Sequence, residues 1–285
     1  MKKSQKSYDN SPSLYLITTP IGNMDDITYR AIKTMEEVDV LLAEDTRVTK
    51  LLLNHFGIKN KLVANHKFNE ESNVEQIISY LKKGMNVGLV SDRGTPIISD
   101  PGYEATKKII EEGFNVISIP GVTALIPALT SSGLSPQPFL FYGFLNSKDS
   151  KQKKELENLK SEKNTIIFYE APHRITNTLT NILEIFGDRK CSISREITKK
   201  FEEIYRGNIS EVLPLLENAK GEMVIVVSGN NCVNTFSNLT IVEHVNLYIK
   251  EGKSVMDSIK LVAKERKLTK NEVYTSYHKG GDLWN

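Results

Sequence analysis

Cysteine is scarce in this 285-residue chain, which contains only Cys191 and Cys232. The two are far apart in the sequence and form no C-x-x-C pair, so we expect neither a disulfide framework nor a structural zinc site. The five histidines form no H-E-x-x-H motif, and we expect no catalytic metal either. So few cysteines are typical of the cytosol, and the sequence therefore predicts a cytoplasmic protein.

Long apolar runs are absent as well. The run MVIVV at residues 223–227 has five residues, whereas a membrane helix needs about 20. The first residues, MKKSQKSYDNSPS, have no apolar stretch of the kind found in secretory signals, and we interpret residues 1–12 as a polar tail. The remaining composition, 39% hydrophobic and 25% charged, is typical of a globular protein. The near balance of 37 basic and 35 acidic residues indicates no particular partner by itself.

Several common catalytic signatures are also missing. Gly252-Lys253-Ser254 resembles the end of a phosphate-binding G-x-x-x-x-G-K-[ST] loop, but Leu247 stands where the first glycine belongs. No G-x-G-x-x-G follows the first expected strand, and no G-x-S-x-G elbow occurs. These absences argue against a P-loop nucleotide hydrolase, a standard nicotinamide dehydrogenase and a serine hydrolase.

The chain alternates between short β-branched runs and amphipathic helical patterns. We expect strands near residues 14–18, 38–42, 87–91 and 116–119, with helices near 27–36, 74–83 and 103–112 between them. For the last of these helices, Asp100 is a candidate cap, Pro101 suits the first position and Gly113 suits the end. Alternation of this kind predicts a mostly parallel sheet covered by helices on both faces.

A second α/β segment follows a polar, lysine-rich stretch. We expect strands near residues 165–169, 191–194 and 222–228, helices near 174–186 and 209–217, and three further helices at 241–250, 255–266 and 270–279. The predicted organisation is an N-terminal α/β domain over 13–145, a linker over 146–164, a C-terminal α/β domain over 165–230 and a helical segment over 239–285.

The loops that follow the expected strands contain the residues best suited to binding. Residues 91–102, SDRGTPIISDPG, are dense in Gly, Pro, Ser, Thr and Asp, and Asp92 is placed to accept from a ligand hydroxyl or amine. Residues 18–23 and 120–124 are similar loops rich in small residues. Because ligands of open α/β sheets bind beyond the carboxyl ends of the strands, we predict a binding cleft there rather than three plain turns.

A basic segment in the second half suggests an anionic partner. Residues 189–200 contain five basic side chains and one acidic side chain. This balance suits a polyanion such as RNA, although a solvated charged loop is the alternative.

Seven motifs, in a fixed order, are similar to those of the tetrapyrrole methylase superfamily, and most closely to its bacterial members that methylate small-subunit ribosomal RNA. They are TPIGN (19–23), AEDTR (43–47), SDRGTPIISDPG (91–102), PGVTAL (120–125), FYEAPHR (168–174), REITK (195–199) and GEMVIVVSG (221–229). The resemblance implies two α/β domains of the tetrapyrrole methylase type with S-adenosylmethionine in the cleft between them, a small C-terminal helical segment, and a homodimer. The implied substrate is the ribose 2′-hydroxyl of a cytidine in 16S ribosomal RNA, either free or in the small ribosomal subunit.

The resemblance also suggests roles for individual residues. It implies cofactor contacts from Pro20, Asp92, Gly94, Thr95, Thr123, Ala124 and Tyr169. Because a ribose hydroxyl is a weak acid, we predict Glu170 as the base and Lys199 or Arg195 as stabilisers of the developing alkoxide. The alternatives are helix capping by Glu170 and a surface pair of Arg195 with Glu196. Candidates for RNA contact are Arg47, His173, Arg174 and the helix at 270–279.

Two residues depart from the superfamily's pattern. Arg93 stands where alanine is usual, and it would bring a cation close to a sulfonium unless it points to a carboxylate or outward to RNA. Ile97 stands where glycine is usual, and we expect it to exclude a left-handed backbone. Two other functions stay open: methylation of a small tetrapyrrole-type molecule, and RNA binding without catalysis.

Overall fold

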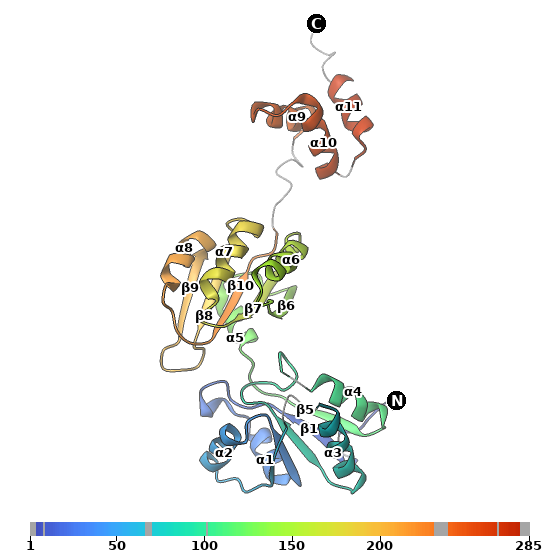
Figure 1. Cartoon of the computed structure of the whole chain (residues 1–285), viewed down its shortest axis with the longest axis vertical. Helices are drawn as coiled ribbons and strands as arrows, with labels where there is room; N and C mark the ends of the chain where they lie inside the picture. The colour runs from blue at the N-terminus through green and yellow to red at the C-terminus, as the bar shows by residue number, and fades with distance from the viewer. Residues whose placement is uncertain are drawn as a thin grey trace. The chain divides into compact units, whose positions relative to one another are not determined.

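The computed structural model describes residues 4–7, 9–65, 70–100, 102–230, 239–266 and 268–279. The chain divides into two compact units, Met1–Asn230 and Asn231–Asn285. Figure 1 labels many of the helices and strands of both units. The first unit holds two five-stranded sheets, and the described part of the second is helical.

The first sheet is entirely parallel and has the strand order β3-β2-β4-β1-β5. Its strands are β1 (Ser13–Ile17), β2 (Val40–Ala43), β3 (Leu62–Ala64), β4 (Val87–Val90) and β5 (Asn115–Ile119). A short 3-10 turn, η1 (Met24–Asp26), follows β1.

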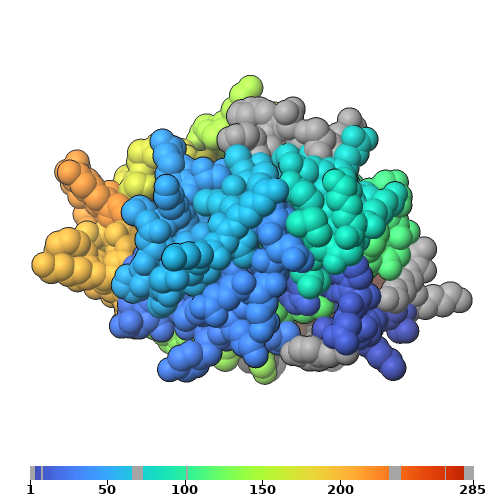
Figure 2. Space-filling view, turned by 90° about the horizontal axis from the view of Figure 1, so that it is seen from below, coloured from blue at the N-terminus to red at the C-terminus, as the bar shows by residue number. Residues whose placement is uncertain are grey.

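Helices cover both faces of this sheet, as the alternating pattern predicts. On one face Ile17 and Leu41 pack with residues of α1 (Tyr29–Glu37) and α2 (Thr46–His55). On the other face Leu16 and Leu42 pack with residues of α3 (Glu70–Lys82) and α4 (Tyr103–Glu111). Successive strand residues point to opposite faces, so each buried strand is apolar on both sides. In Figure 2 the blue to cyan residues of the first hundred form much of the surface seen from below.

The second sheet is mixed and has the order β6-β7-β10-β8-β9, in which only β6 and β7 are parallel. Its strands are β6 (Phe139–Phe144), β7 (Thr165–Glu170), β8 (Lys190–Arg195), β9 (Glu203–Asn208) and β10 (Met223–Val227). α6 (Asp149–Leu159), α7 (Ile175–Phe186), α8 (Ile209–Val212) and η2 (Leu213–Leu216) contribute to the core on one face, and α5 (Leu125–Ser132) packs on the other.

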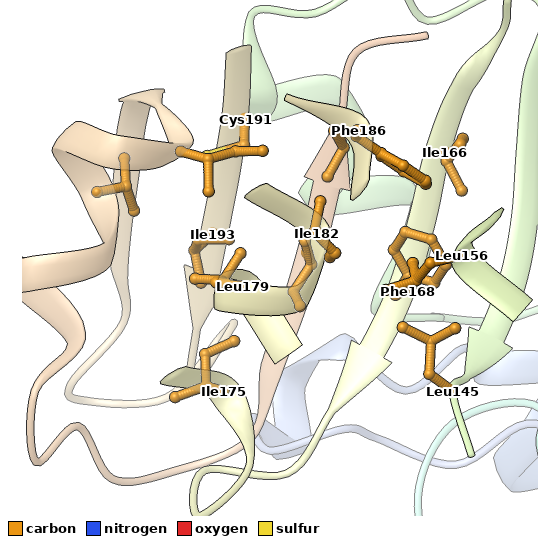
Figure 3. Packing of buried hydrophobic residues seen from close by; sticks show 14 of the residues in the cluster. Leu145, Leu156, Ile166, Phe168, Ile175, Leu179, Ile182, Phe186, Cys191 and Ile193 are labelled. Carbon is orange, nitrogen blue, oxygen red and sulfur yellow. The ribbon is translucent and has the colours of Figure 1, made fainter. Parts of the chain in front are cut away.

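The larger core of this sheet lies between its strands and α7. Figure 3 shows Phe168 and Ile193 on the strands facing Leu179 and Ile182 on the helix. All four side chains are fully buried. Cys191 belongs to the same core, where burial raises the pKa of its thiol to about 12; Cys232 lies outside the described residues.

The change from the first sheet to the second comes earlier than the predicted boundary at residue 145. The strand β6 over Phe139–Phe144 belongs to the second sheet, and Ala128 of α5 already packs on that sheet. The predicted linker over 146–164 contains the helix α6, whose Gln152 and Leu156 are buried. The lysine-rich composition of this stretch reflects a helix with a narrow buried stripe, so polarity alone placed the boundary too late.

The cap predicted for α4 is also different. The N-cap residue is Gly102, so Asp100 does not hold the N-cap position. Pro101 lies outside the described residues. The end of the helix agrees with the prediction, since Gly113 follows the C-cap Glu112 with a φ of +89°.

The second unit contains α9 (Ile241–Lys250), α10 (Val255–Arg266) and α11 (Lys270–Lys279), with the bounds that the periodicity predicts. Thr240 and Glu243 form a capping box at the start of α9. Val245, Ile259, Val262 and Val273 form its small core, next to the buried His244. None of the helices in the described ranges has both the length and the apolar character needed to cross a membrane.

Candidate functional site

A cavity of about 600 Å³ lies where the carboxyl ends of the first sheet's strands meet the second sheet. The first sheet contributes Ile21, Glu44, the loop at 92–100 and Thr123, which follow β1, β2, β4 and β5. The second sheet contributes the ends of β6 and β7 and the start of β10. This volume lies within the range of small-molecule sites, roughly 300–1,000 Å³. The cavity is thus at the edge where the loop composition predicts a cleft.

Six of the seven residues expected to contact the cofactor line this cavity. They are Asp92, Gly94, Thr95, Thr123, Ala124 and Tyr169. Pro20 is buried beside it. Next to Pro20, Thr19 and Gly94 exchange two backbone hydrogen bonds of 3.0 Å, which join the first loop to the second. Pro20 itself is not among the residues that line the cavity, so its contact with a ligand stays a prediction.

Hydroxyl groups connect the loops of the first sheet to each other and to the second sheet. The Thr18 hydroxyl donates to the carbonyl of Ile119 at 3.0 Å, and Thr123 and Tyr169 share a hydrogen bond of 3.3 Å across the two sheets. Burial raises the pKa of the Tyr169 hydroxyl above its usual value, so this group stays protonated at neutral pH. The loops pack so closely that a Cβ on Gly121 would lie 2.6 Å from the Thr18 side chain.

Four charged side chains link the two halves at the cavity. Arg93 donates to Glu222 at 2.6 Å, and Lys199 donates to Glu222 at 2.8 Å and to Glu196 at 2.9 Å. Burial alone would raise the pKa of Glu196, but the hydrogen bonds from Lys199 and from the backbone N–H of Glu222 lower it below its usual value. Arg93 thus points to a carboxylate, which is one of the two arrangements compatible with a nearby sulfonium.

The expectation for Ile97 is wrong. Ile97 has a φ of +77° and Ser99 a φ of +65°, so both adopt the left-handed backbone that glycine tolerates best. The Ile97 side chain packs against the apolar cluster between the first sheet and α3. Packing therefore compensates for the backbone strain, and the loop keeps the backbone that glycine usually provides.

Glu170 borders the cavity, but its side chain is fully buried. One carboxylate oxygen accepts from the Thr178 hydroxyl at 2.6 Å, and the other accepts from the Ala171 N–H at 2.8 Å. The Nε of Arg174 lies 3.3 Å from that second oxygen. These contacts hold Glu170 on the α7 side of the sheet, while Tyr169 faces the cavity. They favour a positioning role over that of a base.

The other residues expected to act on RNA occupy different places. Lys199 lines the cavity, whereas Arg195 lies outside its lining and pairs with Glu203 at 2.8 Å rather than with Glu196. Arg174 also donates to the carbonyls of Leu145 and Asn146, at 2.8 and 3.2 Å, which fixes the β6–α6 connection.

Arg47 and His173 are exposed. The hydrogen bonds from Arg47 to Asp45 lower the pKa of that carboxyl to about 2.

Sequence reasoning missed several residues of the cavity. Glu44 stands inside the AEDTR motif and Ile98 inside the 91–102 loop, but neither was given a role. Val48 follows the same motif on α2, and Phe144 ends β6. Their apolar or unexceptional character gave no chemical signal, and only the fold brings them together.

The family model described as "Tetrapyrrole (Corrin/Porphyrin) Methylases" matches residues 13–213. The chain is 46% identical over 289 residues to a protein of Bacillus subtilis (strain 168) named "Ribosomal RNA small subunit methyltransferase I", covering 98% of this chain and 99% of that relative. The protein of the same name from Thermotoga maritima is 44% identical over 218 residues, which are 76% of this chain and 98% of that relative. About a quarter of this chain therefore has no counterpart in the second relative.

One solved structure shows the same architecture. It is the uroporphyrin-III C-methyl transferase of Thermus thermophilus, complexed with S-adenyl homocysteine, which matches with a TM-score of 0.56 over 76% of this chain and 97% of that chain. The sequence identity is 19%, so the likeness shows a shared fold, and activity must be argued from the site.

Proposed function

This chain belongs to the tetrapyrrole methylase family, and on that premise we propose that it is an S-adenosylmethionine-dependent methyltransferase acting on small-subunit ribosomal RNA. The acceptor we propose is the ribose 2′-hydroxyl of a cytidine in 16S ribosomal RNA. The observation that carries the proposal is the identity of 46%, across nearly the whole chain, with a relative named as a methyltransferase of small-subunit ribosomal RNA. We further propose that the protein acts in the cytoplasm as a homodimer.

The residues of the cavity suit S-adenosylmethionine. Thr95, Thr123 and Tyr169 offer hydroxyls for the ribose and the amino-acid end, and Ala124 and Val224 offer apolar surface for the adenine. When bound, this cofactor supplies an electrophilic methyl group on a cationic sulfur. The Arg93 guanidinium is held by Glu222 at 2.6 Å, and the carboxylate of Asp92 lines the cavity, so the charge distribution accommodates a cation.

The protein's task in the reaction is to orient the ribose hydroxyl and the methyl donor and to stabilise the charge that develops on the ribose oxygen. Transfer would form a bond between the ribose oxygen and the methyl carbon while the carbon–sulfur bond of S-adenosylmethionine breaks, which would leave neutral S-adenosylhomocysteine, and the hydroxyl proton would pass to water. Lys199 lines the cavity with its ammonium held by two carboxylates, so we assign it to stabilise the developing alkoxide. Glu170 holds Arg174 and Thr178 in place, so we assign it to support the cavity wall.

Basic groups suit an RNA acceptor. Arg47 is 88% exposed on α2, and residues 189–200 have a local excess of positive charge. Contacts of such groups with phosphates release counterions, so we expect the affinity for small subunits to fall as salt rises. An affinity independent of salt would argue against phosphate contacts.

The direct test is transfer of label from S-adenosylmethionine to small ribosomal subunits purified from cells that lack the modification. We expect label in the 16S RNA, and none when the subunits come from cells that carry the modification. A tetrapyrrole acceptor in a parallel reaction tests the small-molecule alternative. Labelling of the tetrapyrrole without labelling of RNA would overturn the proposed acceptor.

An Asp92→Ala variant tests the cofactor half of the proposal independently. The Asp92 carboxylate lines the cavity and accepts from the backbone N–H of Asp45 at 2.9 Å. Its loss should weaken binding of S-adenosylmethionine, as measured by calorimetry, by roughly 10-fold for one charge-assisted hydrogen bond. Unchanged affinity would place the cofactor elsewhere.

A further inference from the structure

Three large apolar side chains lie exposed on the wall of the cavity. Phe144 at the end of β6 is 53% exposed, Ile98 in the loop after β4 is 42% exposed and Val48 on α2 is 38% exposed. They come from three separate elements and line the same cavity. Isolated exposed apolar residues need no explanation, but three that converge at a binding cavity indicate an apolar contact. We call these three residues the apolar rim.

A β-bulge brings Phe144 into the rim. In the pairing of β6 with β7, Phe141 lies opposite Ile167 and Gly143 opposite Phe168, so Tyr142 is an extra residue. In a regular register without the bulge, Phe144 would lie opposite Glu170 on the face covered by α7. With it, Phe144 lies opposite Tyr169, and the two rings meet edge to face with centroids 5.6 Å apart. Bulges beside active sites commonly redirect a side chain in this way.

The backbone of the opposite wall is also unusual. Ile98 stands between two left-handed residues, Ile97 and Ser99. The Ser99 hydroxyl oxygen lies 3.3 Å from the place that a Cβ on Gly143 would occupy, so this loop packs against the bulge itself. Such backbone conformations cost stability and concentrate at functional sites. Both walls of the rim are therefore held by special backbone geometry that exposes an apolar side chain instead of burying it.

From this arrangement we propose that the apolar rim, with Phe144 as its stacking ring, binds the base of the nucleotide whose ribose is methylated. The inference rests on the proposed function and adds a specificity-determining contact to it. Proteins that recognise single-stranded RNA stack unpaired bases on aromatic rings, since every base has an apolar face. The base edges are polar, and the carboxylates of Glu44 and Asp100 in the same cavity suit the exocyclic amino group of cytosine.

Two other occupants fit less well. A second copy of this chain seated on the rim would cover the cavity that the acceptor must enter. A tetrapyrrole bearing carboxylate side chains would place them near Glu44, Asp92 and Asp100, which line the same cavity, and like charges repel. A neutral flat base avoids both problems.

The test compares Phe144→Ala with Phe144→Trp, and with Phe139→Ala as the matched control. Phe139 is an exposed ring on the same strand that does not line the cavity. We expect Phe144→Ala to lower kcat/KM for small subunits by about 5- to 150-fold, the range expected for loss of one stacked base. Affinity for S-adenosylmethionine and the melting temperature should not change. Phe144→Trp should retain at least a third of the activity, and Phe139→Ala should behave as the wild type.

The outcomes separate this inference from the proposed function. If the wild type methylates small subunits and Phe144→Ala does so equally well, the inference is overturned and the proposed function stands. If sedimentation shows that Phe144→Ala alone changes the oligomeric state, the rim is a subunit contact and the inference is likewise overturned. If the wild type neither methylates small subunits nor binds them in the presence of S-adenosylhomocysteine, the proposed function fails, and the inference with it.

Discussion

Replacing Glu170 with Gln distinguishes a positioning residue from a base. The Glu170 carboxylate is fully buried, accepts hydrogen bonds of 2.6 and 2.8 Å, and lies 3.3 Å from the Nε of Arg174, which is itself only 22% exposed. Glutamine keeps the shape and one acceptor oxygen. It removes the negative charge, however, and its N–H₂ group must face either the Thr178 hydroxyl, which can accept, or the Ala171 N–H and Arg174, which can only donate.

The expected loss of stability follows from these contacts. Removing one member of a buried ion pair costs about 3–5 kcal/mol, and a hydrogen bond to a charged group contributes about 1.5–3 kcal/mol. Because Gln retains part of the hydrogen bonding, we expect Glu170→Gln to lower the free energy of unfolding by about 2–4 kcal/mol. In a unit of this size that corresponds to a fall in melting temperature of roughly 4–16 °C.

The assay measures thermal unfolding together with methyl transfer at a temperature where the variant is still folded. We expect the variant to be less stable and to retain most of its activity per folded molecule. Glu184→Gln is the matched control, because Glu184 pairs with Lys153 at 2.7 Å on the surface with 58% of its side chain exposed, and such pairs contribute at most about 1 kcal/mol. A Glu170→Gln variant with unchanged stability and no activity would refute this reasoning and favour the base.

Four further predictions concern single residues. Lys199→Met should lower kcat, measured by steady-state kinetics, at least about 10-fold because it removes a cation from the cavity. Arg93→Ala should change the free energy of unfolding, measured by chemical denaturation, by less than about 1 kcal/mol because the pair of Arg93 with Glu222 is largely exposed. Ile97→Gly should change the unfolding free energy by less than about 1 kcal/mol, because relief of a left-handed isoleucine, about 1–2 kcal/mol, offsets the lost packing; a loss above about 3 kcal/mol would contradict the left-handed backbone. Burial, and then Arg266, lower the pKa of His244 below 6.5. The unfolded chain therefore binds more protons than the folded one, and the second unit should lose stability as the pH falls below about 6.5. Hydrogen exchange in α9 and α10 should show weaker protection at pH 5.5 than at pH 7.5, and equal protection at both would contradict the prediction.

The sequence predicts the elements with strong periodicity and misses those without it. The three C-terminal helices and the strands β1, β2, β4 and β5 of the first sheet repeat apolar residues at helix or strand spacing, and their positions agree with the structure. The strand β9, with the sequence EIYRGN, has no apolar run, so only its pairing with β8 makes it a strand. The aromatic run at 139–144 forms β6, which is not among the expected strands, and its partner is decided by tertiary packing, which local pattern does not encode.

The candidate site likewise contains some residues that the sequence predicts and others that it misses. The strand-end loops rich in Gly, Thr and Asp mark the edge of the sheet where the cavity lies, and six of the seven cofactor contacts that the resemblance implies line it. Glu170 shows the limit of such reasoning, because a carboxylate in a motif is equally suited to holding Arg174, and strand alternation decides which face it takes. Phe144 could not be predicted at all, since a one-residue bulge determines whether it joins the core or the cavity.

The position of the transferred methyl group tests the central claim most directly. We would digest 16S RNA from methylated small subunits to nucleosides for mass spectrometry and, in parallel, hydrolyse it with alkali. A 2′-O-methyl group removes the hydroxyl that attacks the neighbouring phosphodiester, so one linkage should resist cleavage and one 2′-O-methylcytidine should appear per RNA. A methyl group on a base, with every linkage cleaved, would contradict the account.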